Sequence, residues 1–297
     1  MYTVAPPMIS IIGILVVFGC VIGGFLMEHG KLMVLVQPAE LVIILGAAIG
    51  TLVAANPIPT VMGVFKGVLS LLTGGGYSKE TYLDGLKMLY DLFALARKVG
   101  MQKLEEDIEN PEASAVFAKY PKFLKHHHAL HFLCDTLRMA VSGGVDAMDL
   151  DAMMELDLEV HHKEAHDPVS ALSTMADSLP GLGIVAAVLG VVITMGSLGG
   201  PKEAIGERVA AALVGTFVGI LLCYGVFGPL ASAMAKQAES EGAYFAFLRM
   251  GSFAFIKGLS PIMATELARR SIPSSVRPTF KEMEEGCRGG GVKVEAA

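Results

Sequence analysis

The sequence predicts an all-α integral membrane protein with four transmembrane helices, a large helical cytoplasmic insert between helices 2 and 3, and a cytoplasmic C-terminal tail. The first observation is composition, because 53% of the 297 residues are hydrophobic and only 18% are charged, which is too apolar for an ordinary soluble domain. The second is clustering. Four runs of apolar residues approach the roughly 20 residues that a bilayer core requires.

The first two spans occupy residues 1–56. Residues 8–27 carry no charge, and no Lys or Arg precedes them, so a membrane helix is favoured over a signal peptide. The second run, 42–55, is short. It reaches the length of a span only if it begins near Leu35 and includes Gln37, Pro38 and Glu40.

Residues 57–177 form the insert. Its first part, 57–73, is apolar but interrupted by Pro, Gly and Lys, which favours a segment lying along the membrane surface. Apolar residues then recur at helical spacing in four stretches, and no alternation typical of strands occurs. These stretches are residues 81–100, 104–109, 130–143 and 147–168.

The third and fourth spans lie within residues 178–235, at 179–201 and 209–235. The fourth is expected to continue as a helix into residues 236–297, a C-terminal helix and tail that is partly disordered near 289–291. The insert and the tail hold 20 of the 23 basic residues, and the positive-inside rule therefore places both in the cytoplasm.

Several classes of function lack the residues they need. No P-loop, nucleophile elbow, metalloprotease motif or catalytic triad is visible, so an enzyme is not expected. The net charge of −6 with no basic block gives no nucleic-acid footprint. The four cysteines have no metal or redox spacing and are interpreted as small apolar residues. The pairs His127 with His131 and His162 with His166 have i, i+4 spacing, yet exposure on a solvated face is favoured over a metal site.

The third and fourth spans contain no Asp, Glu, His, Lys or Arg. Proton and ion pathways in membranes usually depend on such groups, so a proton-moving function would take its carboxylate from another chain. The spans do contain the hydroxyls of Thr194 and Thr216 and a GxxxG pair, Gly215 and Gly219. The pair permits close helix contact, and packing within one subunit is its simplest explanation.

Two prolines lie in these spans. Pro180 stands at the head of the third span, where a proline in the first helical turn is ordinary. Pro229 lies within the fourth span, where it removes a backbone donor and can kink the helix.

Five segments together resemble the MotA family of flagellar motor stator proteins, in the same order and over most of the chain. They are QPAEL from Gln37, LARKVGMQKLEEDIENP from Leu95, DSLPGLGIVAAVLGVV from Asp177, VGTFVGILLCYGVFGPLA from Val214 and RPTFKEMEE from Arg277. The resemblance implies an ion-driven torque generator in the bacterial inner membrane, with a ring of like subunits, a pentamer in this family. A MotB-like single-span partner, anchored to peptidoglycan, would supply the ion-binding aspartate.

The resemblance also implies roles for particular residues. Arg97 and Glu105 match the charged positions that meet the rotor protein FliG, although Gly100 between them makes one continuous helix doubtful. Pro180 and Pro229 match the prolines that couple ion passage to movement. The ion path is assigned to Thr216, Thr194 and Ala187. Sodium-type relatives tend to carry a threonine at position 187, so the alanine here favours protons as the translocated ion. No cofactor is implied beyond that ion.

Two alternatives remain open at this point. One is an energiser of an outer-membrane process like ExbB or TolQ, which share the last two spans but normally have three in total. The other is a self-contained transporter or a membrane scaffold, which would work without a partner chain.

Overall fold

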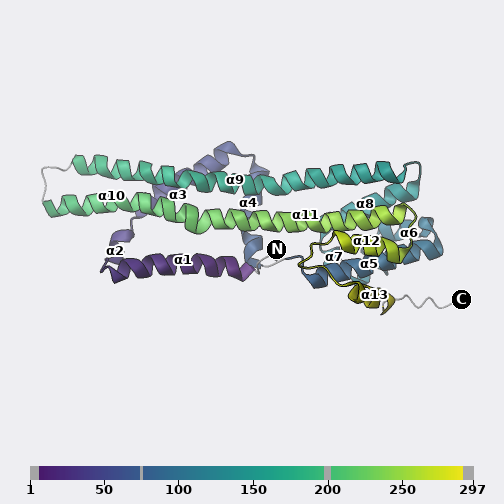
Figure 1. Ribbon diagram of the computed structural model, residues 1–297. Helices are drawn as coiled ribbons and strands as arrows, with labels where there is room; N and C mark the ends of the chain where they lie inside the picture. The colour runs from purple at the N-terminus through teal and green to yellow at the C-terminus, as the bar shows by residue number, and fades with distance from the viewer. Residues whose placement is uncertain (1–6, 74–75, 197–201, 290–297) are drawn as a thin grey trace. The chain divides into compact units, whose positions relative to one another are not determined.

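The computed structural model describes residues 7–73, 76–196 and 202–289, and the described part is helical without strands (Figure 1). This confirms the predicted all-α fold. A short 3₁₀ segment, Phe117–Lys119, lies between α6 and α7, and a π-helical segment, Cys223–Phe227, lies between α10 and α11. The α-helices are α1 (Pro7–Met27), α2 (Leu32–Leu35), α3 (Pro38–Ala55), α4 (Ile58–Thr73), α5 (Lys79–Val99), α6 (Met101–Glu109), α7 (Pro121–Leu124), α8 (His127–Ser142), α9 (Ala147–Met195), α10 (Lys202–Leu222), α11 (Gly228–Ile256), α12 (Pro261–Ser271) and α13 (Phe280–Gly289).

The chain divides into two compact units. We call residues 5–75 and 164–237 the span unit, and residues 76–163 and 238–297 the insert unit. Helices α9 and α11 contribute residues to both. The predicted division at residues 57, 178 and 236 concerns the membrane boundaries and stays a prediction.

Four helices are long and apolar enough to cross a membrane, which confirms the predicted number of spans. The first candidate span is Ser10–Met27, the second is Leu32–Ala55, and the other two lie within α9 and within α10 to α11. The second span therefore does start before Gln37. It is interrupted there because Pro38 occupies the first turn of α3 and fixes the new helix start.

Helix α4 packs into the core of the span unit. Val64 is 4% exposed, Leu71 is also buried, and Gly63 approaches the ring of Pro168 so closely that an added methyl group would lie 2.7 Å from its Cγ. The expectation that this segment lies along the membrane surface stays a prediction, but one face of the helix is covered by protein.

The third span is part of the 49-residue helix α9, which passes through both Pro168 and Pro180. The expected helix end at Pro168 is therefore wrong. A proline inside a helix removes one hydrogen bond and crowds the preceding turn, but burial of Leu172 and Leu179 on this helix favours its continuation.

The fourth span contains a widened turn. At Cys223–Phe227 the backbone is π-helical, and the N–H of Gly228 donates to the carbonyl of Cys223. Pro229 follows directly, and a proline at this position would crowd the carbonyl four residues earlier in a regular helix. The wider turn relieves that crowding, as such turns commonly do where a helix is distorted.

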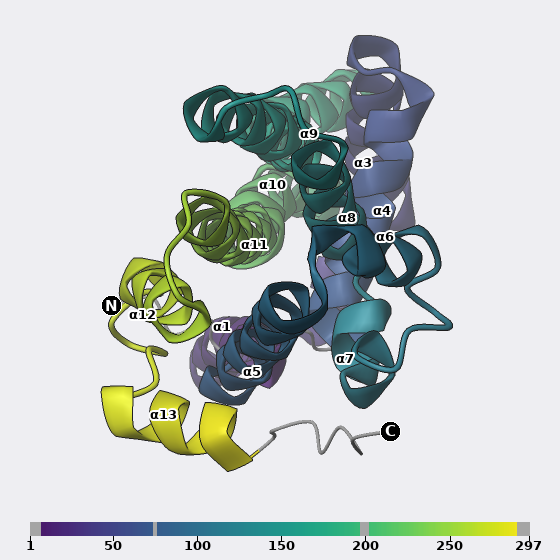
Figure 2. The same ribbon diagram turned by 90° about the vertical axis from the view of Figure 1, so that its right-hand side faces the viewer.

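The insert unit is built around α5, which lies beside α12 and α13 (Figure 2). Leu86 and Leu89 on α5 are fully buried, and the rings of Phe93 and Phe255 stack with centroids 4.3 Å apart. Cys134 and Cys287 are buried in the same core. The fourth span continues as the predicted helix α11 into this unit.

Two further helices occupy the region expected to be mainly tail. In α12, Glu266 accepts hydrogen bonds from Arg269 and Arg270, and the bond from Arg269 is the main cause that lowers the pKa of Glu266. Helix α13 begins with a capping box, in which Thr279 and Glu282 each bond the other's backbone N–H. Residues 290 and 291 of the expected disordered stretch lie outside the described residues.

Candidate ion path and rotor-facing residues

The third span lies in α9 and the fourth in α10 to α11 (Figure 1). They meet backbone to backbone along a row of glycines. A methyl group added at Gly183 would lie 2.8 Å from the carbonyl oxygen of Gly215, and one added at Gly219 would lie 2.6 Å from the carbonyl oxygen of Leu179. We call this contact the glycine seam. The GxxxG pair of α10 thus packs on α9 of the same chain, as the simpler interpretation predicted.

The residues assigned to the ion path differ in exposure. Thr216 and Ala187 are partly exposed, and both flank the seam, since the Cα of Thr216 lies beside Gly183 and Ala187 is one turn beyond that glycine. Thr194 is fully buried, and its hydroxyl donates to the carbonyl of Gly190 at 2.8 Å. Their role in ion passage stays a prediction.

The two prolines predicted to couple ion passage to movement occupy different environments. Pro180 follows Leu179, whose carbonyl forms part of the glycine seam, and it is half-buried. Its interpretation as a first-turn proline is wrong, because α9 begins at Ala147. Pro229 is exposed and follows the π-helical turn.

Arg97 and Glu105 are exposed on two separate helices of the insert unit. Gly100, with a φ of 89°, ends α5 and starts α6, so the two residues do not share one continuous helix. The guanidinium of Arg97 donates to the carbonyl of Leu259 at 3.3 Å, and within the described part of the chain no ion pair links Arg97 to Glu105. Both charges therefore face outward, and their contact with a rotor stays a prediction.

The histidine pairs with i, i+4 spacing lie on α8 and α9. Among the residues that the structure describes, no group of three His, Cys, Asp or Glu side chains has the arrangement of metal ligands. His161 lies with Nε2 at 3.5 Å from Oε1 of Glu241 and packs on the ring of Phe245.

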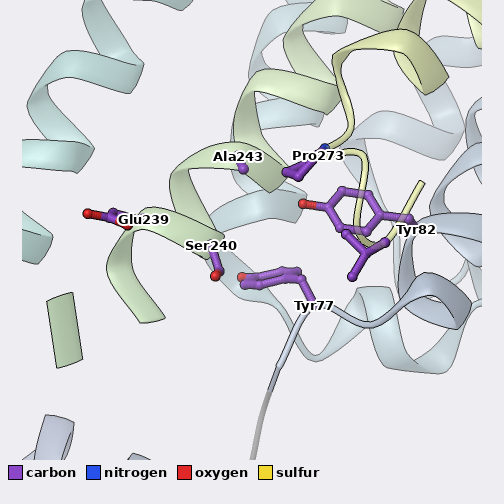
Figure 3. Close-up of a pocket in the computed structure, with 7 residues that line it drawn as sticks. Tyr77, Tyr82, Glu239, Ser240, Ala243 and Pro273 are labelled. Atoms are coloured by element: carbon purple, nitrogen blue, oxygen red, sulfur yellow. The ribbon is translucent and has the colours of Figure 1, made fainter. Parts of the chain in front are cut away.

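The insert unit also contains a cavity of about 230 Å³. Figure 3 shows its aromatic wall, with the hydroxyl of Tyr77 near Ser240 and that of Tyr82 directed toward Pro273. Tyr77 stacks on Tyr244 at 4.6 Å between ring centroids. None of the predicted site residues lines this cavity.

Sequence reasoning gave no role to Glu40. This carboxyl group lies in the first turn of α3 and reaches the glycine seam, where it is 8% exposed. The available signal was a single acidic residue immediately before an apolar run, which alone does not reveal what the side chain contacts.

Comparison with known proteins identifies relatives over nearly the whole chain. Residues 11–100 match the family model "Motility protein A N-terminal", and residues 124–246 match "MotA/TolQ/ExbB proton channel family". Motility protein A of Escherichia coli is 41% identical over 95% of each chain. Chemotaxis protein LafT of Vibrio parahaemolyticus is 35% identical over 92% of this chain and 96% of its own.

Solved structures share the fold. The C. jejuni MotAB structure has a TM-score of 0.73 at 17% identity and covers 89% of this chain and 95% of that one. The flagellar MotAB stator complex of Bacillus subtilis has a TM-score of 0.71 at 22% identity, with coverage of 90% and 96%. The match to the proton channel family, together with the four apolar helices, indicates a membrane protein. The chain therefore belongs to the motility protein A family, within the MotA/TolQ/ExbB proton channel family.

Proposed function

We propose that this chain is the ring-forming subunit of a flagellar stator, which surrounds a MotB-like single-span partner and converts proton flow into torque on the rotor. The family's motility proteins and the MotAB complexes among the solved structures support this function. The partner is anchored to peptidoglycan, and the insert and the tail face the cytoplasm.

The observation that carries the proposal is the exposed face of the third and fourth spans. Ile184, Val188 and Val192 of α9 and Leu213 of α10 are each about half exposed or more. A large uncovered apolar surface marks contact with lipid or with other proteins. Further copies of this chain, in a ring of five, and the partner's membrane helix would cover it together with lipid.

The same spans explain why a partner is needed. They offer hydroxyls and small residues but no Asp, Glu, His, Lys or Arg. Protonation of the partner's aspartate beside Thr216 would change its charge and its hydrogen bonding, and so favour the next position of the ring. Pro180 and Pro229 would allow the spans to adjust, and the insert would move with them.

Arg97 and Glu105 would then meet the rotor protein FliG. Exposed ion pairs contribute only about 0 to 1 kcal/mol each. They are therefore suited to steering and orienting a moving partner rather than to binding it tightly.

A pair of double variants tests the rotor contact. Arg97→Ala with Glu105→Ala should abolish torque while membrane assembly and proton leak persist. Lys98→Ala with Glu106→Ala is the matched control, since these neighbouring charges are exposed on the same helices. Unchanged swimming in the first variant would refute the assigned contact.

Purification and ion dependence test the rest. The chain should co-purify with a single-span protein that carries an aspartate in its membrane helix and a peptidoglycan-binding domain. A TonB-type partner would instead indicate an energiser, and specific flux through this chain alone would indicate a transporter. Swimming speed should fall with a proton uncoupler. A speed that follows sodium and ignores the uncoupler would overturn the assignment to protons.

A further inference from the structure

Glu40 is a buried carboxyl group that the proposed mechanism does not use. Glu40 as a whole is 8% exposed to solvent. Its Oε2 atom is inaccessible to solvent and has no hydrogen-bond partner among the described residues. A buried ionised carboxylate without a partner is strongly unfavourable, particularly within a membrane. The group therefore needs a partner that the described part of this chain does not provide.

Glycines of two other helices form the space that the carboxyl group occupies. A methyl group added at Gly215 of α10 would lie 2.5 Å from Oε2, and one added at Gly190 of α9 would lie 3.5 Å from Oε1. A larger residue at Gly215 would displace the carboxyl group. The glycine seam thus both joins α9 to α10 and admits a side chain from α3.

This position adjoins the predicted ion path. Gly215 directly precedes Thr216 in the chain, and the carbonyl of Gly190 accepts the hydroxyl of Thr194. The carboxyl group therefore lies against the backbone of α9 and α10 next to two ion-path residues.

No ion pair within the described residues fixes the protonation state of Glu40. Residues 178–195 of α9 contain no titratable side chain, while Arg208 on α10 and Lys31 before α2 are basic. Within the described residues neither forms an ion pair with Glu40. The positive N-terminal end of α3 favours the anion, whereas burial without a partner opposes it.

The surroundings of the Glu40 carboxyl group suit the binding of a proton better than the binding of a metal cation. Hard cations require several oxygen ligands, but Oε2 lies beside Gly215, which also approaches the methyl group of Ala186. Among the described residues no group of three His, Cys, Asp or Glu side chains could hold a metal ion. A proton needs only one lone pair.

We propose that Glu40 is a second proton-binding site of the ion path, contributed by this chain rather than by its partner. The carboxylate takes up one proton, forming one O–H bond, and later releases the same proton toward the region of Thr216. No other bond changes. This inference rests on the proposed proton-channel function.

The test uses the complete complex with its partner, purified and reconstituted into vesicles of bacterial lipid. Glu40→Gln keeps the size of the side chain but cannot exchange a proton, and Glu40→Asp keeps the acid. Glu28→Gln is the matched control, because Glu28 is an exposed carboxylate at the end of the first span. Proton flux under a membrane potential and the infrared band of protonated carboxyl groups are measured for each.

Glu40→Gln is expected to assemble normally, to lose one protonated-carboxyl band and to lower proton flux by about tenfold or more. Glu28→Gln should keep the protonated-carboxyl band and the wild-type proton flux. Wild-type flux in Glu40→Gln, or an unchanged infrared band, overturns the inference. If Glu40→Gln does not assemble, a shifted carboxyl band in Glu40→Asp supports it and an unshifted band overturns it. Absence of proton flux in the wild-type complex would instead refute the proposed function.

Discussion

The glycine seam predicts a large effect for one methyl group. In Gly219→Ala the new Cβ would lie 2.6 Å from the carbonyl oxygen of Leu179 and 3.0 Å from the Cα of Gly183. Both atoms belong to the backbone, so no side chain can rotate away. Because close carbon–oxygen contacts between helices start at about 3.3 Å, the two helices must separate by roughly 0.7 Å.

Overpacking of this kind costs about 1 to 3 kcal/mol, and a loss of 2 kcal/mol lowers the ratio of folded to unfolded protein about 30-fold. The free energy of unfolding can be measured by titrating the purified protein with denaturing detergent. Gly46→Ala is the control, because a methyl group added there meets nothing within 4 Å. If the free energy of unfolding of Gly219→Ala lies within about 0.5 kcal/mol of that of Gly46→Ala, the reasoning is refuted, since such a difference is typical of surface substitutions.

Three further substitutions probe the insert unit. Glu266→Gln should lower the free energy of unfolding by about 1 to 3 kcal/mol at pH 7, since it weakens hydrogen bonds to two arginines. Arginine hydrogen bonds lower the pKa of Glu266, so the difference from wild type should shrink in a pH series below about 4.3, where unfolded glutamate protonates. Phe93→Ala removes a fully buried ring stacked on Phe255 and should cost about 3 to 5 kcal/mol in urea unfolding. Thr279→Ala removes the cap of α13 and should cost about 1 kcal/mol, measured as faster hydrogen exchange in that helix.

The membrane spans were the most predictable part of the fold. A bilayer imposes a minimum length of apolar sequence, and all four runs are confirmed as long apolar helices. Helix ends were less predictable. Pro168 and Pro180 suggested a boundary because of local backbone sterics, but tertiary packing carried α9 through both.

The sequence contains a local signal for the last C-terminal helix. Thr279 followed three residues later by Glu282 is the pattern of a capping box, and it does start α13. By contrast, the environment of Glu40 depends on glycines about 150 and 175 positions later in the chain. No local pattern links those positions, so only the assembled helices reveal their contact.

The burial of the insert unit's cysteines has a practical consequence for chemical labelling. Burial raises the pKa of the Cys134 and Cys287 thiols to about 12, so at pH 8 only about one thiol in 10⁴ is the nucleophilic thiolate. Maleimide dyes and cross-linkers will therefore bypass both. With the exposed Cys20 replaced, a cysteine introduced at Arg97 or Glu105 can carry a fluorophore or a photo-cross-linker without removal of the two buried thiols, which allows the predicted rotor contact to be mapped directly.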